Sequence, residues 1–327
     1  MTTWVLRLVG VLLILTAIAI GLSRAPDLPV EALVGKWAPP PSEFIDLRGQ
    51  LVHLRDEGPR HTGTGGSPAP IVLLHGTSAS LHTWEGWVAG LKGQRRVISF
   101  DLPGFGLTGP YTGAYTAGED AAGDYSGDTY ARFVLDLLDH LQLPQVVLAG
   151  NSLGGDIAWR VAVLAPERVQ SLVLVDAAGP PFQPEKIPTA WMLARTPGLG
   201  WLLESMLPRS LVAEGLESVY GDPSKVTPEL VDRYFALALR EGNRRALGER
   251  LRNWQPGEGS ERIDSIRQPT LILWGGRDRL IPPAIGKEFE RRIAGSRLVV
   301  FDNLGHVPHE EDPVATLVPV REFLGLR

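Results

Sequence analysis

The chain has 327 residues, of which 44% are hydrophobic and 21% charged, and its formal net charge is −5. This composition is typical of a globular protein with a large core, and the slight negative charge gives no reason to expect a nucleic-acid partner, which requires a basic face. The absence of cysteine excludes disulfides, thiolate metal sites and a cysteine nucleophile.

Residues 1–22 form a segment of their own, because positions 4–22 are almost entirely apolar and Arg7 is the only charge among them. As a helix rising about 1.5 Å per residue, this stretch would cover roughly 28 Å, close to the hydrocarbon thickness of a bilayer. We therefore expect residues 4–22 to anchor the protein in a membrane, with the remaining chain in the periplasm or outside the cell. The alternative is a cleaved signal peptide and a secreted protein, because Ala17-Ile18-Ala19 offers small residues at a suitable spacing.

Residues 23–41 are predicted to be a Pro-rich linker, because Pro26, Pro29 and the prolines at 39–41 oppose regular structure. A single domain is expected over residues 42–327. After a hairpin at 44–54, short apolar runs alternate with longer helical stretches, which is typical of a doubly wound, mostly parallel α/β sheet. The expected strands lie at 71–75, 96–101, 145–150, 171–176, 270–274 and 297–301.

Between two of these strands, at about residues 180–259, helical patches alternate with prolines and no strand pattern appears. We predict a helical cap there. Its apolar residues Trp191, Met192 and Trp201 are predicted to bind an apolar part of a substrate, although such residues at helical spacing more often belong to a core.

The central motif is Gly150-Asn151-Ser152-Leu153-Gly154, which follows an apolar strand and precedes a helical run. Strand, turn and helix in this order are the setting of a nucleophile elbow, where glycines allow the sharp turn that exposes the serine oxygen. The motif alone is weak evidence. Its position predicts that Ser152 is a nucleophile.

Two further residues, which come much later in the chain, are expected to act together with Ser152. His306 and Asp278 each follow an apolar run, so both are expected at the carboxyl ends of strands, where open α/β sheets keep their sites. We predict that His306 is the base and that Asp278 orients it, in the chain order Ser, Asp, His.

Other titratable residues at strand ends compete for these roles. Asp176 is the rival for the acid, and His309 is the rival for the base, although His309 is expected at the surface or in a supporting position. His75 is expected to hold its own loop by hydrogen bonds, and Asp101 is expected to cap a turn.

Acyl transfer also requires donors for a tetrahedral oxyanion. We predict that these are the backbone N–H of Leu153, directly after the nucleophile, and the N–H of Thr77, with Ser78 as the second choice. No metal and no organic cofactor is expected.

These motifs resemble those of the α/β-hydrolase superfamily from about residue 42 to the end of the chain. The elbow, followed by Gly155, is similar to that of the meta-cleavage-product (carbon–carbon bond) hydrolases. That family usually has a Trp after the catalytic His and a Gly-rich oxyanion loop, whereas this chain has Val307 and, at 77–80, Thr-Ser-Ala-Ser. Epoxide hydrolases and haloalkane dehalogenases carry Asp at the elbow, so Ser152 argues against both. The motifs that carry the resemblance are His75-Gly76, Asp101-Leu102-Pro103-Gly104-Phe105-Gly106, the elbow, the run at 275–278 and Gly305-His306.

The resulting hypothesis is that the protein has an α/β-hydrolase fold and hydrolyses a small, apolar carboxylic ester through an acyl-serine intermediate. One alternative is a different hydrolase with the same triad: a carbon–carbon bond hydrolase, an amidase, a thioesterase or a lactonase. The other is a non-catalytic, membrane-tethered binding module.

Overall fold

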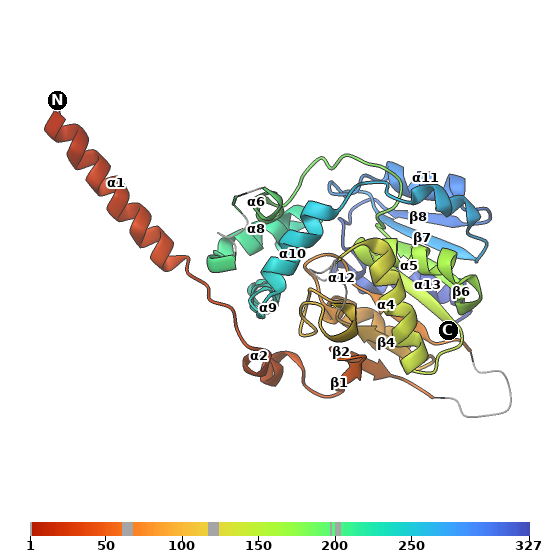
Figure 1. Cartoon of the computed structure of the whole chain (residues 1–327). Coiled ribbons are helices and arrows are strands. Elements are labelled where there is room, and N and C mark those ends of the chain that lie inside the picture. The colour runs from red at the N-terminus through yellow and green to blue at the C-terminus, as the bar shows by residue number, and fades with distance from the viewer. Residues whose placement is uncertain (1, 61–67, 117–123, 197, 200–203) are drawn as a thin grey trace.

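The computed structural model describes residues 2–60, 68–116, 124–196, 198–199 and 204–327. Its centre is an eight-stranded sheet in the order β1-β2-β4-β3-β5-β6-β7-β8 (Figure 1). The strands are β1 (Ser42–Leu47), β2 (Gln50–Glu57), β3 (Ile71–Leu74), β4 (Val97–Phe100), β5 (Val146–Asn151), β6 (Val169–Val175), β7 (Thr270–Gly275) and β8 (Arg297–Phe301).

The pairing of the strands confirms the doubly wound sheet. β1 and β2 form the expected hairpin, β2 pairs with β4 antiparallel, and every pair from β4 to β8 is parallel. Because the parallel strands are covered on both faces, they are apolar at successive positions.

Helices cover both faces of the sheet, and each face has its own core. Along β3, Val72 and Leu74 belong to the core beneath α4 (Gly127–His140) and α5 (Leu153–Leu164). Ile71 and Leu73 point the other way and pack with Trp87 beneath the helices of the second face. The remaining helices of the domain body are η1 (Leu81–Trp84), α3 (Glu85–Leu91), η2 (Gly113–Tyr115), η3 (Pro166–Arg168), η5 (Ser260–Ser265), α11 (Ala284–Arg292), α12 (Pro308–Glu311) and α13 (Pro313–Leu324).

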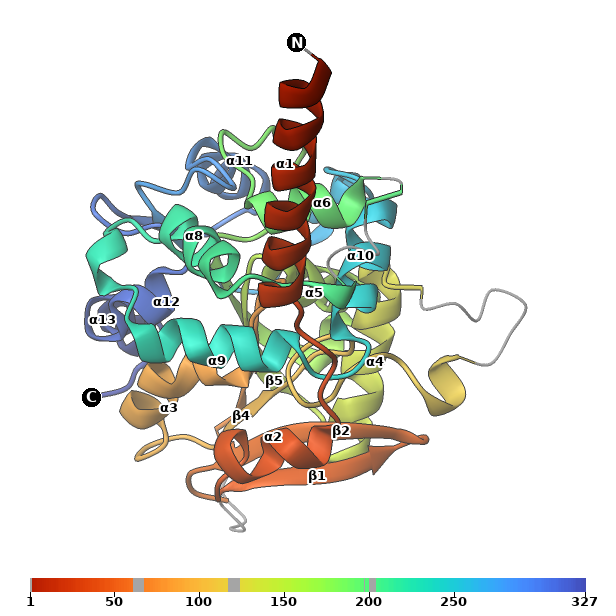
Figure 2. The ribbon, with the colours of Figure 1, turned by 90° about the vertical axis from the view of Figure 1, so that its left-hand side faces the viewer.

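A helical cap lies between β6 and β7, as the sequence predicted, and Figure 2 looks onto its helices. The cap begins after the carboxyl end of β6, at the edge of the sheet where β5 also ends, and the chain then passes through η5 to the start of β7 at the opposite edge. The cap helices are α6 (Thr189–Arg195), α8 (Arg209–Val219), η4 (Pro223–Lys225), α9 (Pro228–Ala238) and α10 (Asn243–Asn253).

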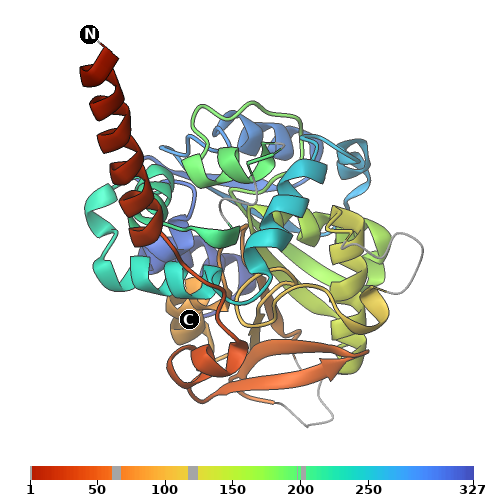
Figure 3. The same cartoon turned by 60° about the vertical axis from the view of Figure 1, so that its left-hand side comes forward.

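The N-terminal segment forms one helix, α1 (Thr2–Leu22), which projects beyond the rest of the molecule in Figures 1 and 3. Its described apolar side chains are exposed, with Trp4 at 73%, Leu8 at 74% and Leu13 at 65%. Within the part of the chain that the structure describes, no helix is both long and apolar enough to cross a membrane.

The prediction of an unstructured linker at 23–41 was wrong. Helix α2 (Val30–Trp37) forms there, because the prolines bracket it: Pro29 precedes its first residue, and no proline interrupts it. Its buried Leu33 packs with Leu107 and with Leu237 of the cap.

The residues before α2 are also joined to the cap. The N–H of Leu28 donates to the carbonyl of Leu239 at 2.7 Å, and the N–H of Glu241 donates back to the carbonyl of Leu28 at 2.9 Å. Asp27 forms an ion pair with Arg244 of α10. The segment after α1 is therefore part of the cap rather than a spacer.

Candidate active site

Ser152 lies at the turn between β5 and α5, in a strained backbone conformation with φ 55° and ψ −114°. The turn requires glycine at two positions, because backbone atoms of other residues approach these positions closely. A Cβ on Gly150 would lie 2.1 Å from the carbonyl oxygen of Gly154, and a Cβ on Gly154 would lie 2.1 Å from that of Leu74. The glycines of the motif are thus required by packing, and the arrangement is that of a nucleophile elbow.

His306 and Asp278 meet beside this turn. The His306 Nδ1 lies 2.7 Å from the Asp278 Oδ2, and both side chains are buried. The other oxygen, Oδ1, accepts hydrogen bonds from the N–H groups of Leu280 and Ile281 at 2.8 and 2.9 Å. With its carboxylate fixed in this way, Asp278 holds the imidazole through Nδ1, which leaves Nε2 for another partner.

Two polar side chains that the sequence analysis missed hold the His306 loop. Asn151, next to Ser152, donates from Nδ2 to the carbonyl of His306 at 2.9 Å. Glu311 accepts from the N–H groups of Gly305 at 2.8 Å and of Gly221 in the cap at 2.9 Å. The elbow, the histidine loop and the cap are therefore tied together by side chains whose partners are distant in sequence.

Asp176, the other candidate for the acid that orients the histidine, is a neighbour of Asp278 and is fully buried. Its Oδ1 accepts a hydrogen bond from the N–H of Gly275 at 2.9 Å. No described group donates a hydrogen bond to its Oδ2. Burial and then the neighbouring Asp278 raise the pKa of Asp176 well above its usual range. The geometry favours Asp278 as the partner of the histidine, because the His306 Nδ1 is hydrogen bonded to the Asp278 Oδ2.

Among the described residues, Asp176, Asp278 and His306 are also the group whose ligand atoms could hold a metal, since these atoms lie within 4.8 Å of one another. The hydrogen bond between His306 and Asp278 already uses two of these atoms. We assign no metal to the group.

The two expected oxyanion donors face the same site. Thr77 follows β3 and lines a cavity together with Ser152, and Leu153 is the first residue of α5. No described residue accepts a hydrogen bond from the backbone N–H of either one. Both donors are thus free for an oxygen of a substrate.

The two other histidines considered in the sequence analysis, His75 and His309, have structural partners. His75 lies with Nδ1 2.8 Å from the carbonyl of Gly76, while its Nε2 accepts from the N–H of Leu102, so it holds its own loop as expected. His309 was expected at the surface or in a supporting position, and the surface position is excluded. It is fully buried, its ring centroid lies 4.0 Å from that of Trp84, and its Nε2 is 3.1 Å from the Thr83 Oγ1. Burial, and then His306, lowers the pKa of His309 well below its usual range.

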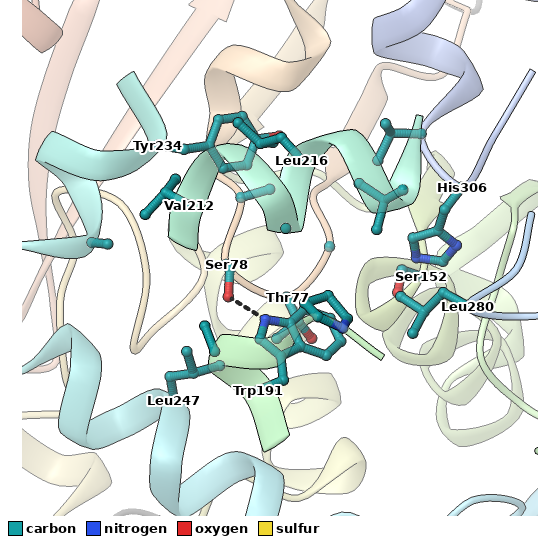
Figure 4. Close-up of a pocket in the computed structure, with 18 of the residues that line it drawn as sticks. Thr77, Ser78, Ser152, Trp191, Val212, Leu216, Tyr234, Leu247, Leu280 and His306 are labelled. Atoms are coloured by element: carbon teal, nitrogen blue, oxygen red, sulfur yellow. Dashed lines mark hydrogen bonds between the residues drawn. The ribbon is translucent and has the colours of Figure 1, made fainter. Parts of the chain in front are cut away.

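Two cavities meet at Ser152. The first, which we call the α8 cavity, also contains His306 and Val307, and Figure 4 shows Ser152 and His306 at one end of it. Its walls are mainly hydrocarbon and come from the cap: Pro188, Ala190, Trp191, Leu207, Leu211, Val212, Leu216, Val219, Ala238 and Leu247, with Tyr234 and Arg244 as polar members.

The second cavity, which we call the Trp254 cavity, extends from Ser152 toward the other part of the cap. Thr77, Ser152, Trp191 and Leu280 line both cavities. The further walls of the Trp254 cavity include Leu153, Ala178, Phe182, Pro184, Ile187, Arg195, Arg250, Leu251, Trp254, Pro256 and Ile281.

The three cap residues predicted to bind substrate have different positions. Trp191 lines both cavities. Met192 does not line either one and is 47% exposed, because successive residues of a helix point about 100° apart and its neighbour takes the inward position. The prediction for Met192 was therefore wrong, and Trp201 lies outside the described residues.

Comparisons with known proteins agree with this architecture. Residues 69–313 match the family described as alpha/beta hydrolase fold. A 2-hydroxy-6-oxo-2,4-heptadienoate hydrolase of Pseudomonas putida is 30% identical over 270 residues, which cover 79% of this chain and 90% of the relative.

Solved structures show the same fold at lower identity. A meta-cleavage product hydrolase from Pseudomonas fluorescens superposes with a TM-score of 0.71 at 24% identity, covering 86% of this chain and 97% of that one. A bacterial membrane phospholipase A superposes with a TM-score of 0.67, also at 24% identity, and covers 99% of this chain and 98% of that one.

Proposed function

Because the chain belongs to the α/β hydrolase fold family and is a hydrolase, we propose that it cleaves carboxylic esters with an apolar acyl chain. The observation that carries this proposal is the meeting of two cavities at Ser152. An ester has two halves joined at the scissile carbonyl, and each half needs its own space when that carbonyl lies against the nucleophile. The hydrocarbon walls of the α8 cavity suit the alkyl chain.

In the proposed mechanism, the Ser152 Oγ attacks the carbonyl carbon while His306 Nε2 takes the hydroxyl proton. Asp278 stabilises the imidazolium, and the N–H groups of Thr77 and Leu153 donate to the oxyanion. Collapse of the intermediate expels the alcohol, which receives the proton from His306. Water, deprotonated by His306, then attacks the acyl carbon and releases the carboxylic acid and the free serine.

The test is an acyl-length series of p-nitrophenyl esters with the full-length protein in detergent, and Ser152→Ala as the control. We expect kcat/KM to rise with chain length while added methylenes enter the α8 cavity, at up to about 0.8 kcal/mol each, and then to fall. If a fluorophosphonate labels Ser152 but no ester of the series is hydrolysed, the ester proposal is wrong. If Ser152 is not labelled either, the protein is a binding module rather than an enzyme.

Carbon–carbon bond hydrolysis is the second candidate, and Arg250 favours it. This arginine lines the Trp254 cavity and is buried, and it donates from Nη1 only to the carbonyl of Tyr125 at 3.3 Å. Its Nε has no hydrogen-bond partner among the described residues, no described acidic side chain forms an ion pair with it, and its guanidinium carbon lies 6.0 Å from the ring centroid of Tyr130. A substrate carboxylate, such as that of a dienoate, would match this cation.

Side-by-side kinetics on 2-hydroxy-6-oxo-2,4-heptadienoate and on a p-nitrophenyl ester separate the two candidates. A kcat/KM that is higher for the dienoate would make carbon–carbon bond cleavage the function. In that case, Arg250→Met should weaken dienoate cleavage more than ester cleavage, because only the dienoate carries a charge to be matched.

We also propose that residues 4–22 attach the protein to a membrane, with the catalytic domain outside the cytoplasm. The exposed apolar side chains of α1 support this, since a helix with such a surface is poorly accommodated in water. Fractionation followed by N-terminal sequencing is the test. Intact Met1 or Thr2 in the membrane fraction supports attachment, a new N-terminus near residues 20–26 indicates a cleaved signal peptide, and full-length cytosolic protein contradicts both.

A further inference from the structure

Trp191 has a special position in the site, because it separates the two cavities that meet at Ser152. It lies on α6, and its side chain lines the α8 cavity on one side and the Trp254 cavity on the other. The other shared residues, Thr77, Ser152 and Leu280, lie at the junction itself. Trp191 is therefore the cap residue that forms the wall between the cavities.

A hydrogen bond, drawn in Figure 4, holds the Trp191 side chain that forms this wall. The indole Nε1 of Trp191 donates to the Ser78 Oγ at 3.2 Å. Ser78 directly follows the oxyanion donor Thr77 and has a positive φ of 65°, which is unfavourable for a residue with a Cβ. The cap is thus joined through Trp191 to the loop that presents the Thr77 N–H.

We propose that Trp191 determines the specificity of the enzyme by dividing the two halves of the substrate, and that its hydrogen bond to Ser78 holds this wall in place. The inference rests on the proposed function, since the two halves are those of an ester at Ser152. While the Trp191 indole occupies this position, the acyl chain of the substrate must pass along one side of the ring. It must therefore be narrow at the carbon next to the scissile carbonyl. Branched substituents at that carbon contact the wall, whereas linear chains run along it.

The experiment compares two p-nitrophenyl esters with the same number of carbon atoms, the linear pentanoate and the branched 2,2-dimethylpropanoate. The measured quantity is the ratio of kcat/KM for the branched ester to that for the linear ester. A partly unfolded preparation lowers both values equally, so this ratio reports on the wall and not on the amount of folded enzyme. Trp191→Ala should raise the ratio at least about tenfold, because contacts of one or two methylenes in a pocket are worth 10–200-fold.

Three further variants separate the wall from its hydrogen bond. Trp191→Phe keeps a ring but loses the donor, and Ser78→Ala loses the acceptor, so both should raise the ratio by the same smaller factor, about twofold to fivefold, the equivalent of one weak hydrogen bond. Met192→Ala is the matched control, because Met192 is on the same helix but lines neither cavity. If Trp191→Ala does not fold, Trp191→Leu provides the same comparison.

A ratio in Trp191→Ala and Trp191→Leu equal to that of the wild type would overturn the proposal. So would a change of the same size in Met192→Ala. If the wild type hydrolyses neither ester, the proposed function fails, and the wall is then tested by the rates at which a linear and a branched alkyl fluorophosphonate label Ser152. A higher branched-to-linear labelling ratio in Trp191→Ala supports the wall, and an unchanged ratio contradicts it.

Discussion

The molecule contains two Ser-His-Asp arrangements. In one, the His306 Nδ1 lies 2.7 Å from the Asp278 Oδ2 beside Ser152. In the other, the His53 Nδ1 lies 2.7 Å from the Asp101 Oδ2, and the His53 Nε2 lies 2.9 Å from the Ser42 Oγ. The distances between histidine and acid are the same.

The surroundings of the two serines differ. Ser152 has the strained backbone of an elbow and lies at the junction of two cavities, next to two free N–H donors. Ser42 is the first residue of β1, and its Oγ also accepts from the Arg55 Nε at 3.0 Å. Ser42 and His53 line neither of the cavities at Ser152. We therefore expect Ser152, and not Ser42, to act as a nucleophile, because a serine that attacks a carbonyl needs access to it and donors for the oxyanion.

Ser152→Ala should produce the largest effect, a loss on the order of 10⁶ in kcat, because the nucleophile of such a triad is removed and only the oxyanion donors and substrate binding remain. The measurement is ester hydrolysis by purified protein, with circular dichroism to verify folding. Retention of more than about a hundredth of the activity would show that Ser152 is not the nucleophile.

Asp278→Asn should lower kcat by about 10⁴ at neutral pH, because an amide stabilises the wrong tautomer of His306 and carries no charge. Asp176→Asn should change kcat by no more than about tenfold, equivalent to about 1.4 kcal/mol, because the hydrogen bond to His306 is made by Asp278 and not by Asp176. Activity and pH profiles of both variants are the measurement. If the two losses are reversed, the acid of the triad is Asp176.

The sequence predicted which residues come together at Ser152 better than it predicted their surroundings. Ser152, Asp278 and His306 each end or follow an apolar strand, and parallel strands bring such ends to one edge of the sheet. The roles of Asn151 and Glu311 were not predictable, because Asn151 bonds to the carbonyl of His306 and Glu311 bonds to the N–H of Gly221, and both partners are distant in sequence.

The cap residues that face the site could likewise be predicted only in part from the sequence. Helical periodicity located its helices, but which of the neighbours Trp191 and Met192 faces the site depends on how α6 is rotated against the sheet. Helix α2 was missed for a local reason. Prolines at its two ends were interpreted as breakers of the whole segment, whereas Pro directly before or at the first turn is compatible with a helix.

The buried network around His53 should affect stability rather than turnover, and His82 provides a pH test of this. Burial lowers the pKa of His82 from 6.5 to about 4, and Asp101 partly opposes the shift. Between these pH values the unfolded chain binds more protons at this position than the folded one, so His82 makes the folded state less stable as the pH falls from about 6.5 to 4.

We therefore expect the wild type to lose more thermal stability between pH 7 and pH 4.5 than His82→Gln, by on the order of 1–3 kcal/mol. Glutamine keeps a donor for the carbonyl of Trp37, which lies 2.8 Å from the His82 Nε2, but it does not titrate. Thermal unfolding followed by tryptophan fluorescence is the measurement. The same pH dependence in both proteins would mean that His82 is not buried in its neutral form.

Ser42→Ala is the variant that tests the comparison most directly, and its expected effect on activity is the smallest. It removes the serine of the second arrangement and leaves the His53 Nε2 and the Arg55 Nε without this partner, which should cost about 1–3 kcal/mol of folding free energy. Its kcat and its labelling by fluorophosphonate should equal those of the wild type, because Ser42 faces no substrate cavity at Ser152. Denaturant unfolding, esterase kinetics and mass spectrometry of the labelled peptide measure these three quantities on one preparation. A fluorophosphonate adduct on Ser42, or a large loss of kcat in a variant that remains folded, would mean that buried hydrogen bonds suffice to activate a serine. The distinction between the two arrangements would then be wrong.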